Sequence, residues 1–317
     1  MRIKIITFWI LISGFSFSVF SHGIYKLRKK VLFSSYVLVV EIDNPYNGEK
    51  TEVYDKVIND SVETTFYRVG GDGRADLYVQ RSLKGEVFAD SIIIRNEPSN
   101  KSPYYPDKKE ALVFLGKTDS LDSYYTIGVI PVGNSAELNW YTQQVEALLR
   151  IQQIKSKRTQ NIETTEWLVQ CAENKYTRWD GAYELSRNRH WISNEDFFKD
   201  EKHRNHLTRS QKERLEKVFF ENDTIGYTEL CLSDFVSKKR NSKLKERLLL
   251  NLKIAGEKEY FSFVEALMKR YLDIEKNNQL KIIYEDFRNL THDISIEQHE
   301  ELIDRFINLG YQTKLAY

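Results

Sequence analysis

The sequence contains little cysteine, with only Cys171 and Cys231 in a chain of 317 residues. A dense disulfide framework of the kind that holds small secreted domains together is therefore excluded. Cys171 shares a helical stripe with Trp167 and Leu168, and Cys231 shares another with Leu230, so both thiols are predicted to point into a core. Two interpretations stay open at this point: two buried thiols, or one disulfide between two helices.

The chain also lacks a strong charge of either sign. It carries 47 Lys and Arg against 46 Asp and Glu, a formal net charge of +1. Such a balance gives no electrostatic basis for binding nucleic acid or an anionic membrane surface. We therefore predict neither a nucleic-acid partner nor a membrane interaction beyond an export signal.

Sequence motifs of the common enzyme classes are missing as well. No G-x-S-x-G, no P-loop, no G-x-G-x-x-G after a strand and no zinc-ligand quartet is present. These absences favour a non-catalytic protein, and we assign no catalytic residue and no cofactor.

An N-terminal apolar run is too short to span a bilayer, which takes about 20 residues. Arg2 and Lys4 precede the run, Ile5–Phe20 forms it, and Val19-Phe20-Ser21 offers small residues for cleavage. This pattern predicts a signal peptide over 1–21 and an exported protein, periplasmic or extracellular. An uncleaved anchor or a buried strand is the alternative.

What the sequence does contain is a change of hydrophobic period near Gly133. Before it, short runs rich in Val, Ile, Leu, Tyr and Phe alternate with turn signals, which predicts a small antiparallel β-barrel over 22–134. The expected strands are Val31–Ile42, Ser61–Val69, Asp76–Gln80, Ser91–Arg95, Ala111–Leu115 and Ser123–Val129. Ala111–Leu115 is apolar throughout, as expected of a strand buried on both faces.

After Gly133 the apolar residues return every third or fourth position. Leu138, Tyr141, Val145 and Leu148 predict a helix over 136–155 that packs on the barrel. Capping-box pairs are expected to open further helices, which are joined by short polar loops. These pairs are Thr177 with Asp180, Thr208 with Gln211, and Ser295 with Gln298. The fold class predicted is α+β with two domains, the second an all-α array of helical hairpins over 135–317.

Three segments of the β half carry a resemblance to a known family. Ser35–Glu41, Ala75–Gly85 and Lys109–Gly116 resemble strands of the netrin-like module, the OB-type barrel shared with tissue inhibitors of metalloproteinases. The helical half is similar to the HEAT-like arrays that follow such barrels in some exported bacterial proteins. The resemblance implies an OB-like barrel, but the inhibitors chelate zinc through an N-terminal Cys-x-Cys. No cysteine precedes Cys171, so protease inhibition is not carried over.

The candidate binding residues are Arg178, Trp179, Asp180 and Tyr183. Trp and Arg dominate interaction hot spots, so this helical motif is a candidate recognition patch. Alternatively, Trp179 and Tyr183 pack between hairpins while Arg178 pairs with a neighbouring carboxylate.

Histidines and a basic run complete the candidates. His203 and His206 are weak metal candidates, because they lack the H-E-x-x-H spacing and flank a polar loop; no metal site is predicted. His292 and His299 are expected on the surface. Lys238-Lys239-Arg240 is expected to be a solvated loop.

Together these observations predict an exported, non-catalytic binding or scaffolding protein of the cell envelope, with an unidentified protein as its partner. The helical array and the barrel would be its interaction surfaces. The alternative is an envelope hydrolase, or an inhibitor of one, with a site at the barrel–helix junction.

Overall fold

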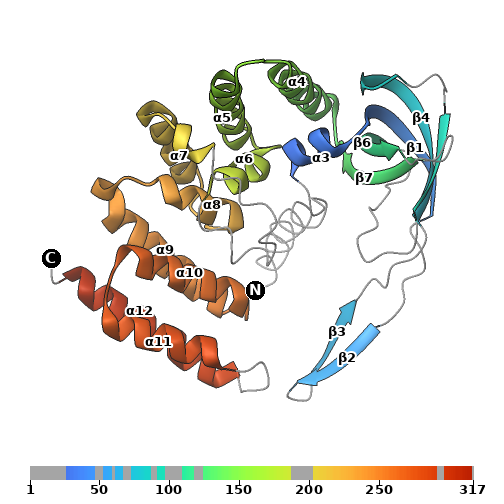
Figure 1. The fold of residues 1–317 in the computed structure, drawn as a ribbon. Helices are drawn as coiled ribbons and strands as arrows, with labels where there is room; N and C mark the ends of the chain where they lie inside the picture. The colour runs from blue at the N-terminus through green and yellow to red at the C-terminus, as the bar shows by residue number, and fades with distance from the viewer. Residues whose placement is uncertain are drawn as a thin grey trace, which may run out of the picture. The chain divides into compact units, whose positions relative to one another are not determined.

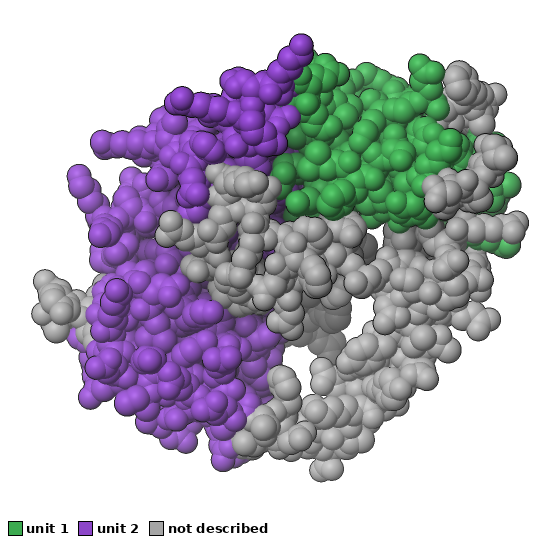
Figure 2. All heavy atoms as spheres, viewed as in Figure 1, with its two compact units in different colours: residues 1–153 green, residues 154–317 purple. Residues whose placement is uncertain are grey.

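The computed structural model describes residues 26–46, 53–58, 61–66, 73–86, 91–96, 109–117, 124–186, 203–290 and 296–315 (Figure 1). The chain forms two compact units, 1–153 and 154–317, which Figure 2 colours separately. The expected signal peptide lies outside the described residues. None of the described helices combines the length and the apolar character needed to span a bilayer.

In its described part, the first unit consists of strands with two helices. Its elements are α3 (Leu27–Phe33), β1 (Tyr36–Tyr46), β2 (Val53–Ile58), β3 (Ser61–Phe66), β4 (Gly73–Lys84), β5 (Ser91–Asn96), β6 (Lys109–Lys117), β7 (Tyr124–Pro131) and α4 (Ser135–Gln152). Strands β2 and β3 pair only with each other in the described chain, as a separate antiparallel hairpin.

The other strands form one antiparallel sheet in the order β5-β4-β1-β6-β7. Within it, β6-β1-β4-β5 is the spatial order of a Greek key, in which a fourth strand returns to lie beside the first. The two edge strands, β5 and β7, approach each other because the sheet curls into a half-barrel (Figure 1). The predicted fold class, a barrel-like antiparallel sheet followed by helices, is confirmed.

Strand β6 shows why the sheet has two apolar faces. Ala111, Val113 and Leu115 belong to the core cluster inside the curl, where they meet β1 and β4 side chains such as Val40 and Leu77. The intervening residues, such as Phe114, are buried on the opposite face of the sheet. Helix α3 packs on β6 and β7, and α4 packs on β4. The prediction that Ala111–Leu115 is buried on both faces is therefore confirmed.

The start of the first strand was predicted wrongly, because Val31–Phe33 ends helix α3 instead of beginning β1. Val31 is fully buried, and Lys84 of β4 donates from Nζ to the carbonyl oxygens of Val31 (2.8 Å) and Ser34 (2.5 Å). These bonds help to satisfy carbonyls at the end of the helix, where the Val31 carbonyl also accepts from the Ser34 hydroxyl at 3.2 Å. A residue 50 positions away thus stabilises the end of α3.

Helix α4 packs on the sheet of the first unit. Asn134 caps it by accepting from the Glu137 amide at 3.0 Å, and the Glu137 carboxylate accepts from the Gly133 amide at 2.9 Å. Arg81 of β4 donates to Glu146 at 2.6 Å, which joins the helix to the sheet surface.

The second unit is entirely helical in its described part. Its elements are α5 (Lys157–Glu173), α6 (Arg178–Leu185), the 3-10 turn η3 (Arg204–His206), α7 (Arg209–Glu221), α8 (Tyr227–Leu232), η4 (Ser233–Phe235), η5 (Lys238–Arg240), α9 (Asn241–Gly256), α10 (Phe261–Ile274), α11 (Asn278–Asn289) and α12 (Ile296–Leu315). Neighbouring helices pack in pairs, such as α5 with α6, α9 with α10, and α11 with α12.

The predicted caps gave mixed results. The capping box at Thr208 is confirmed: Gln211 N donates to the Thr208 hydroxyl at 3.2 Å, and Thr208 N donates to Gln211 Oε1 at 2.8 Å. The box at Thr177 is wrong, because its hydroxyl donates to the Cys171 carbonyl at 2.9 Å instead of accepting from the α6 amides. Ser295 lies outside the described residues.

Cys171 and Cys231 are both buried thiols. Burial raises the pKa of the Cys171 thiol well above its usual range, and the carboxylates of Asp180 and Glu184 raise it further. A thiol held protonated is a poor nucleophile, which argues against a catalytic role for Cys171.

Candidate functional site

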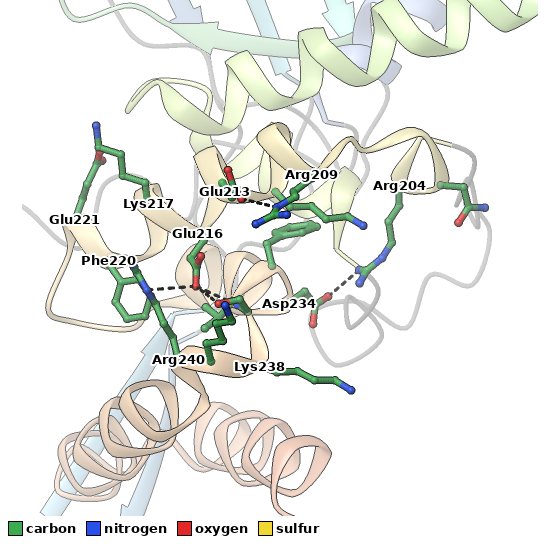
Figure 3. Close-up of a pocket in the computed structure, with 16 residues that line it drawn as sticks. Arg204, Arg209, Glu213, Glu216, Lys217, Phe220, Glu221, Asp234, Lys238 and Arg240 are labelled. Atoms are coloured by element: carbon green, nitrogen blue, oxygen red, sulfur yellow. Dashed lines mark hydrogen bonds and ion pairs between the residues drawn. The ribbon is translucent and has the colours of Figure 1, made fainter.

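The helical unit contains a groove that is lined throughout by described residues. One wall is a face of α7; the other is the segment 234–240 of η4 and η5, with Arg204 and Asn205 at one end (Figure 3). We call it the α7 groove. Its volume is about 1400 Å³, which exceeds the 300–1,000 Å³ of typical small-molecule sites. The dimensions suit a polymer segment better than a small ligand.

Glu216 ties the two walls together. Its side chain is only 11% exposed and accepts at 3.0 Å from both the backbone amide and the hydroxyl of Ser237. Arg240 Nε lies 3.8 Å from the same carboxylate oxygen (Figure 3). Because a buried carboxylate needs such partners, these contacts fix the segment 237–240 beside α7.

Asp234 has the corresponding role at the end of the groove where Arg204 lies. Its side chain is 4% exposed and accepts from Arg204 at 3.2 Å and from the Ser186 hydroxyl at 2.8 Å. The Arg204 guanidinium also lies over the Phe235 ring, 5.4 Å from its centroid. Arg204 is thereby oriented by two different neighbours.

Phe220 contributes the main aromatic surface of the α7 wall, but cations cover it. The Arg240 guanidinium lies 5.3 Å and the Lys243 ammonium 4.8 Å from the ring centroid. The Phe219 ring meets it edge-on at 4.9 Å. Phe220 therefore orients basic groups and is not an open stacking platform for a nucleobase.

The charges of the groove are unbalanced. Of the lining residues that the structure describes, seven are basic and four acidic, an excess of three positive charges. Every acid has a partner within the protein: Glu216 and Asp234 as above, Glu213 with Arg209 at 2.9 Å, and Glu221 with Arg178 at 3.1 Å.

The lysines of the groove differ from its carboxylates, which all have partners. Lys212, Lys217, Lys238 and Lys239 are exposed and form no ion pair within the described part of the chain. The groove therefore combines occupied carboxylates with available ammonium groups.

The residues proposed from the sequence as a recognition patch are divided by the structure. Asp180 is buried, with 1% of its surface exposed, whereas Trp179 and Tyr183 are half-buried with their ring centroids 5.2 Å apart. Arg178 alone reaches the groove wall, through Glu221. Asp180 is therefore not available on the surface, whereas Arg178, Trp179 and Tyr183 are partly exposed.

The histidines also lie in different surroundings. His203 is buried and His206 exposed. No cluster of three or more metal-binding side chains occurs in the residues that the structure describes. His292 lies outside the described residues. The surface prediction for His299 is wrong: it is buried and stacks on Phe261, with centroids 4.2 Å apart.

Sequence reasoning did not find the α7 groove. The Lys238-Lys239-Arg240 run was seen, but only as a solvated loop. The exposed face of α7 is visible as the polar side of an amphipathic helix, yet polar helix faces are common. The signal that matters is the approach of residues 234–240 to α7, and no local pattern encodes it.

No family model, curated protein or solved structure matches this chain. Its function must therefore be argued from its own geometry and chemistry.

Proposed function

We propose that this chain is an exported, non-catalytic binding or scaffolding protein of the cell envelope, whose helical unit holds a protein partner in the α7 groove. The observation that carries the proposal is the groove itself. Its walls are fixed by Glu216 and Asp234, and its size exceeds that of a small-molecule pocket.

The chemistry of the groove supports binding over catalysis. Its carboxylates are engaged in ion pairs with Arg204, Arg209 and Arg178, so none is positioned as a general base. No lining residue that the structure describes is a histidine or a cysteine, and the one serine, Ser237, donates both its hydroxyl and its backbone amide to Glu216, which makes it part of the groove wall.

For the first unit we propose a netrin-like, OB-type barrel. The Greek-key order of the sheet and the approach of β5 to β7 support it, because the OB-fold is a partly open, five-stranded Greek-key barrel. The segments that carry the sequence resemblance, around Tyr36, Leu77 and Val113, all lie in strands of this sheet.

Export is tested by fractionation and by sequencing the mature N-terminus. We expect the protein in the envelope or medium, beginning at His22. Retention of the chain in the cytoplasm with an intact Met1 would refute the exported location.

The binding proposal is tested by site-specific photo-crosslinking in intact cells. A photoreactive residue replaces Asn205 at the end of the groove, or exposed Lys155 as the matched position outside it. We expect one discrete protein adduct at position 205 and none at 155. Equal labelling at both positions would argue against a groove partner. Turnover in a peptide and glycan hydrolase screen would instead favour the alternative function.

A further inference from the structure

We infer that the α7 groove binds an extended, carboxylate-rich segment of its protein partner. This inference deepens the proposed function and rests on it. The argument depends on which charges of the groove are already occupied and where the others lie.

The acidic side chains of the groove have partners, whereas four of its lysines form no ion pair in the described chain. All four described carboxylates of the groove have cationic or hydrogen-bonding partners, among them Glu216 with Ser237 and Asp234 with Arg204. Lys212, Lys217, Lys238 and Lys239 have no ion-pair partner in the described chain. Ammonium groups that line one groove repel one another, and an anionic ligand removes that repulsion.

These lysines are distributed over both walls. Lys212 and Lys217 belong to α7, whereas Lys238 and Lys239 belong to η5 on the opposite wall. A ligand lying along the groove therefore meets ammonium groups on two sides. Alternate side chains of an extended peptide point in opposite directions, which matches this two-sided arrangement.

The spacing along α7 also fits an extended chain. Lys212 and Lys217 are separated by about 7.5 Å along the helix axis at 1.5 Å per residue. Carboxylates on alternate residues of an extended peptide repeat at about 6.6 Å. The residues of the segment that face α7 therefore bring successive carboxylates near its successive lysines, and the acidic residues between them face the lysines of η5.

Nucleic acid is the less suitable polyanion. Stacking platforms supply much of single-strand affinity, but Arg240 and Lys243 cover the Phe220 ring. The chain as a whole is close to neutral, so it lacks the broad positive field that draws a phosphate backbone to a protein.

The test is fluorescence anisotropy on the full mature chain. The probe is a labelled peptide of consecutive Glu residues, compared with the same peptide carrying Gln for Glu. We expect the Glu peptide to bind at least tenfold more tightly in low salt, and its affinity to fall as salt rises.

Matched double variants locate the binding. Lys212→Glu with Lys239→Glu reverses one charge on each wall; Lys155→Glu with Lys258→Glu makes the same change in net charge at exposed positions outside the groove. We expect at least a tenfold loss of affinity for the groove pair and less than a twofold change for the control pair. Because all four lysines are exposed, both variants should keep the wild-type circular dichroism and melting temperature.

Equal losses for the two pairs would overturn the inference, since they would show only net-charge attraction. Tighter binding of an oligonucleotide than of the Glu peptide would also overturn it. If the peptide fails to bind while position 205 still forms its adduct, the acidic ligand is wrong and the proposed function stands. If the peptide binds the groove but no adduct forms in cells, the ligand chemistry stands and the envelope partner is wrong.

Discussion

Gly181 of α6 lies against the backbone of α5, directly beside the carbonyl oxygen of Leu168. A Cβ atom built on Gly181 would come within 2.3 Å of that oxygen and 2.4 Å of the Ala172 amide nitrogen. Backbone atoms cannot give way as the end of a flexible side chain can, so the close approach of the two helices depends on glycine at this position.

Gly181→Ala is expected to destabilise the protein by about 3 kcal/mol, because α6 must move away from α5. Helix propensity alone predicts the opposite sign, a gain of about 1 kcal/mol. Denaturant unfolding measures the difference. The control is Gly226→Ala, whose new methyl group would meet only the end of the Glu229 side chain and which should cost less than about 1 kcal/mol. A stabilised Gly181→Ala protein would contradict the packing.

Arg214 joins α7 to α5 by reaching two carboxylates at once. It donates to Glu173 at 2.7 and 2.5 Å and to Glu166 at 2.8 and 3.1 Å. A lysine ammonium cannot reproduce this planar, forked geometry, so Arg214→Lys should lose about 1 kcal/mol of unfolding free energy.

The exposed pair of Arg209 and Glu213 provides the control, since the Arg209 side chain is 93% exposed. Arg209→Lys should change the unfolding free energy by less than about 0.5 kcal/mol. Similar effects of the two lysine substitutions would show that the forked contacts of Arg214 contribute little.

Glu166 is expected to make the stability depend on pH. Burial by itself raises the pKa of this carboxyl, but hydrogen bonds from Gln211, Arg214 and Gln170 outweigh that effect and leave the pKa below its usual value of 4.5. The folded state therefore favours the ionised form. This contribution is fully present above about pH 4.5 and is lost as the pH falls through the lower, folded-state value.

Glu166→Gln removes that ionisation. Wild type should exceed the variant in unfolding free energy at pH 7, and the gap should shrink when both are measured at about pH 3.5. Urea unfolding at the two pH values gives the comparison. A gap that widens on acidification would mean that the folded state favours the neutral carboxyl.

His299 is held by two aromatic rings without a full set of hydrogen bonds. It stacks on Phe261 at an interplanar angle of 17° and meets Phe287 nearly edge-on, at 84°. Its Nδ1 is buried and has no hydrogen-bond partner among the residues that the structure describes. A buried polar atom of this kind costs about 1–3 kcal/mol.

His299→Phe should keep the ring contacts and remove the polar atom, which raises the unfolding free energy by about 1 kcal/mol. His299→Ala removes the ring and should lower it by about 2 kcal/mol or more. Thermal melting of the two variants tests both expected changes in stability. A marked loss of stability in His299→Phe would show that a polar contact of the imidazole matters more than its stacking.

Local sequence patterns predicted the structure correctly where a single hydrophobic pattern or a single helix cap decides it. Ala111–Leu115 is apolar at every position because the curled sheet buries both of its faces, and Thr208 with Gln211 forms its box within four residues. Thr177 shows the limit of such rules. Its hydroxyl has a competing acceptor in the Cys171 carbonyl, which the packing of α6 against α5 brings within reach.

The amino-acid sequence by itself determined the order of a β half and a helical half, because residue periods of two and of three to four depend only on neighbouring positions. Tertiary structure alone decided where the α7 groove lies. Its walls meet because Glu216 binds Ser237, 21 residues away, and its carboxylates are occupied because Glu213, Glu221 and Asp234 pair with Arg209, Arg178 and Arg204. Contacts between residues far apart in the sequence depend on how the whole chain packs, so a local sequence pattern does not predict them.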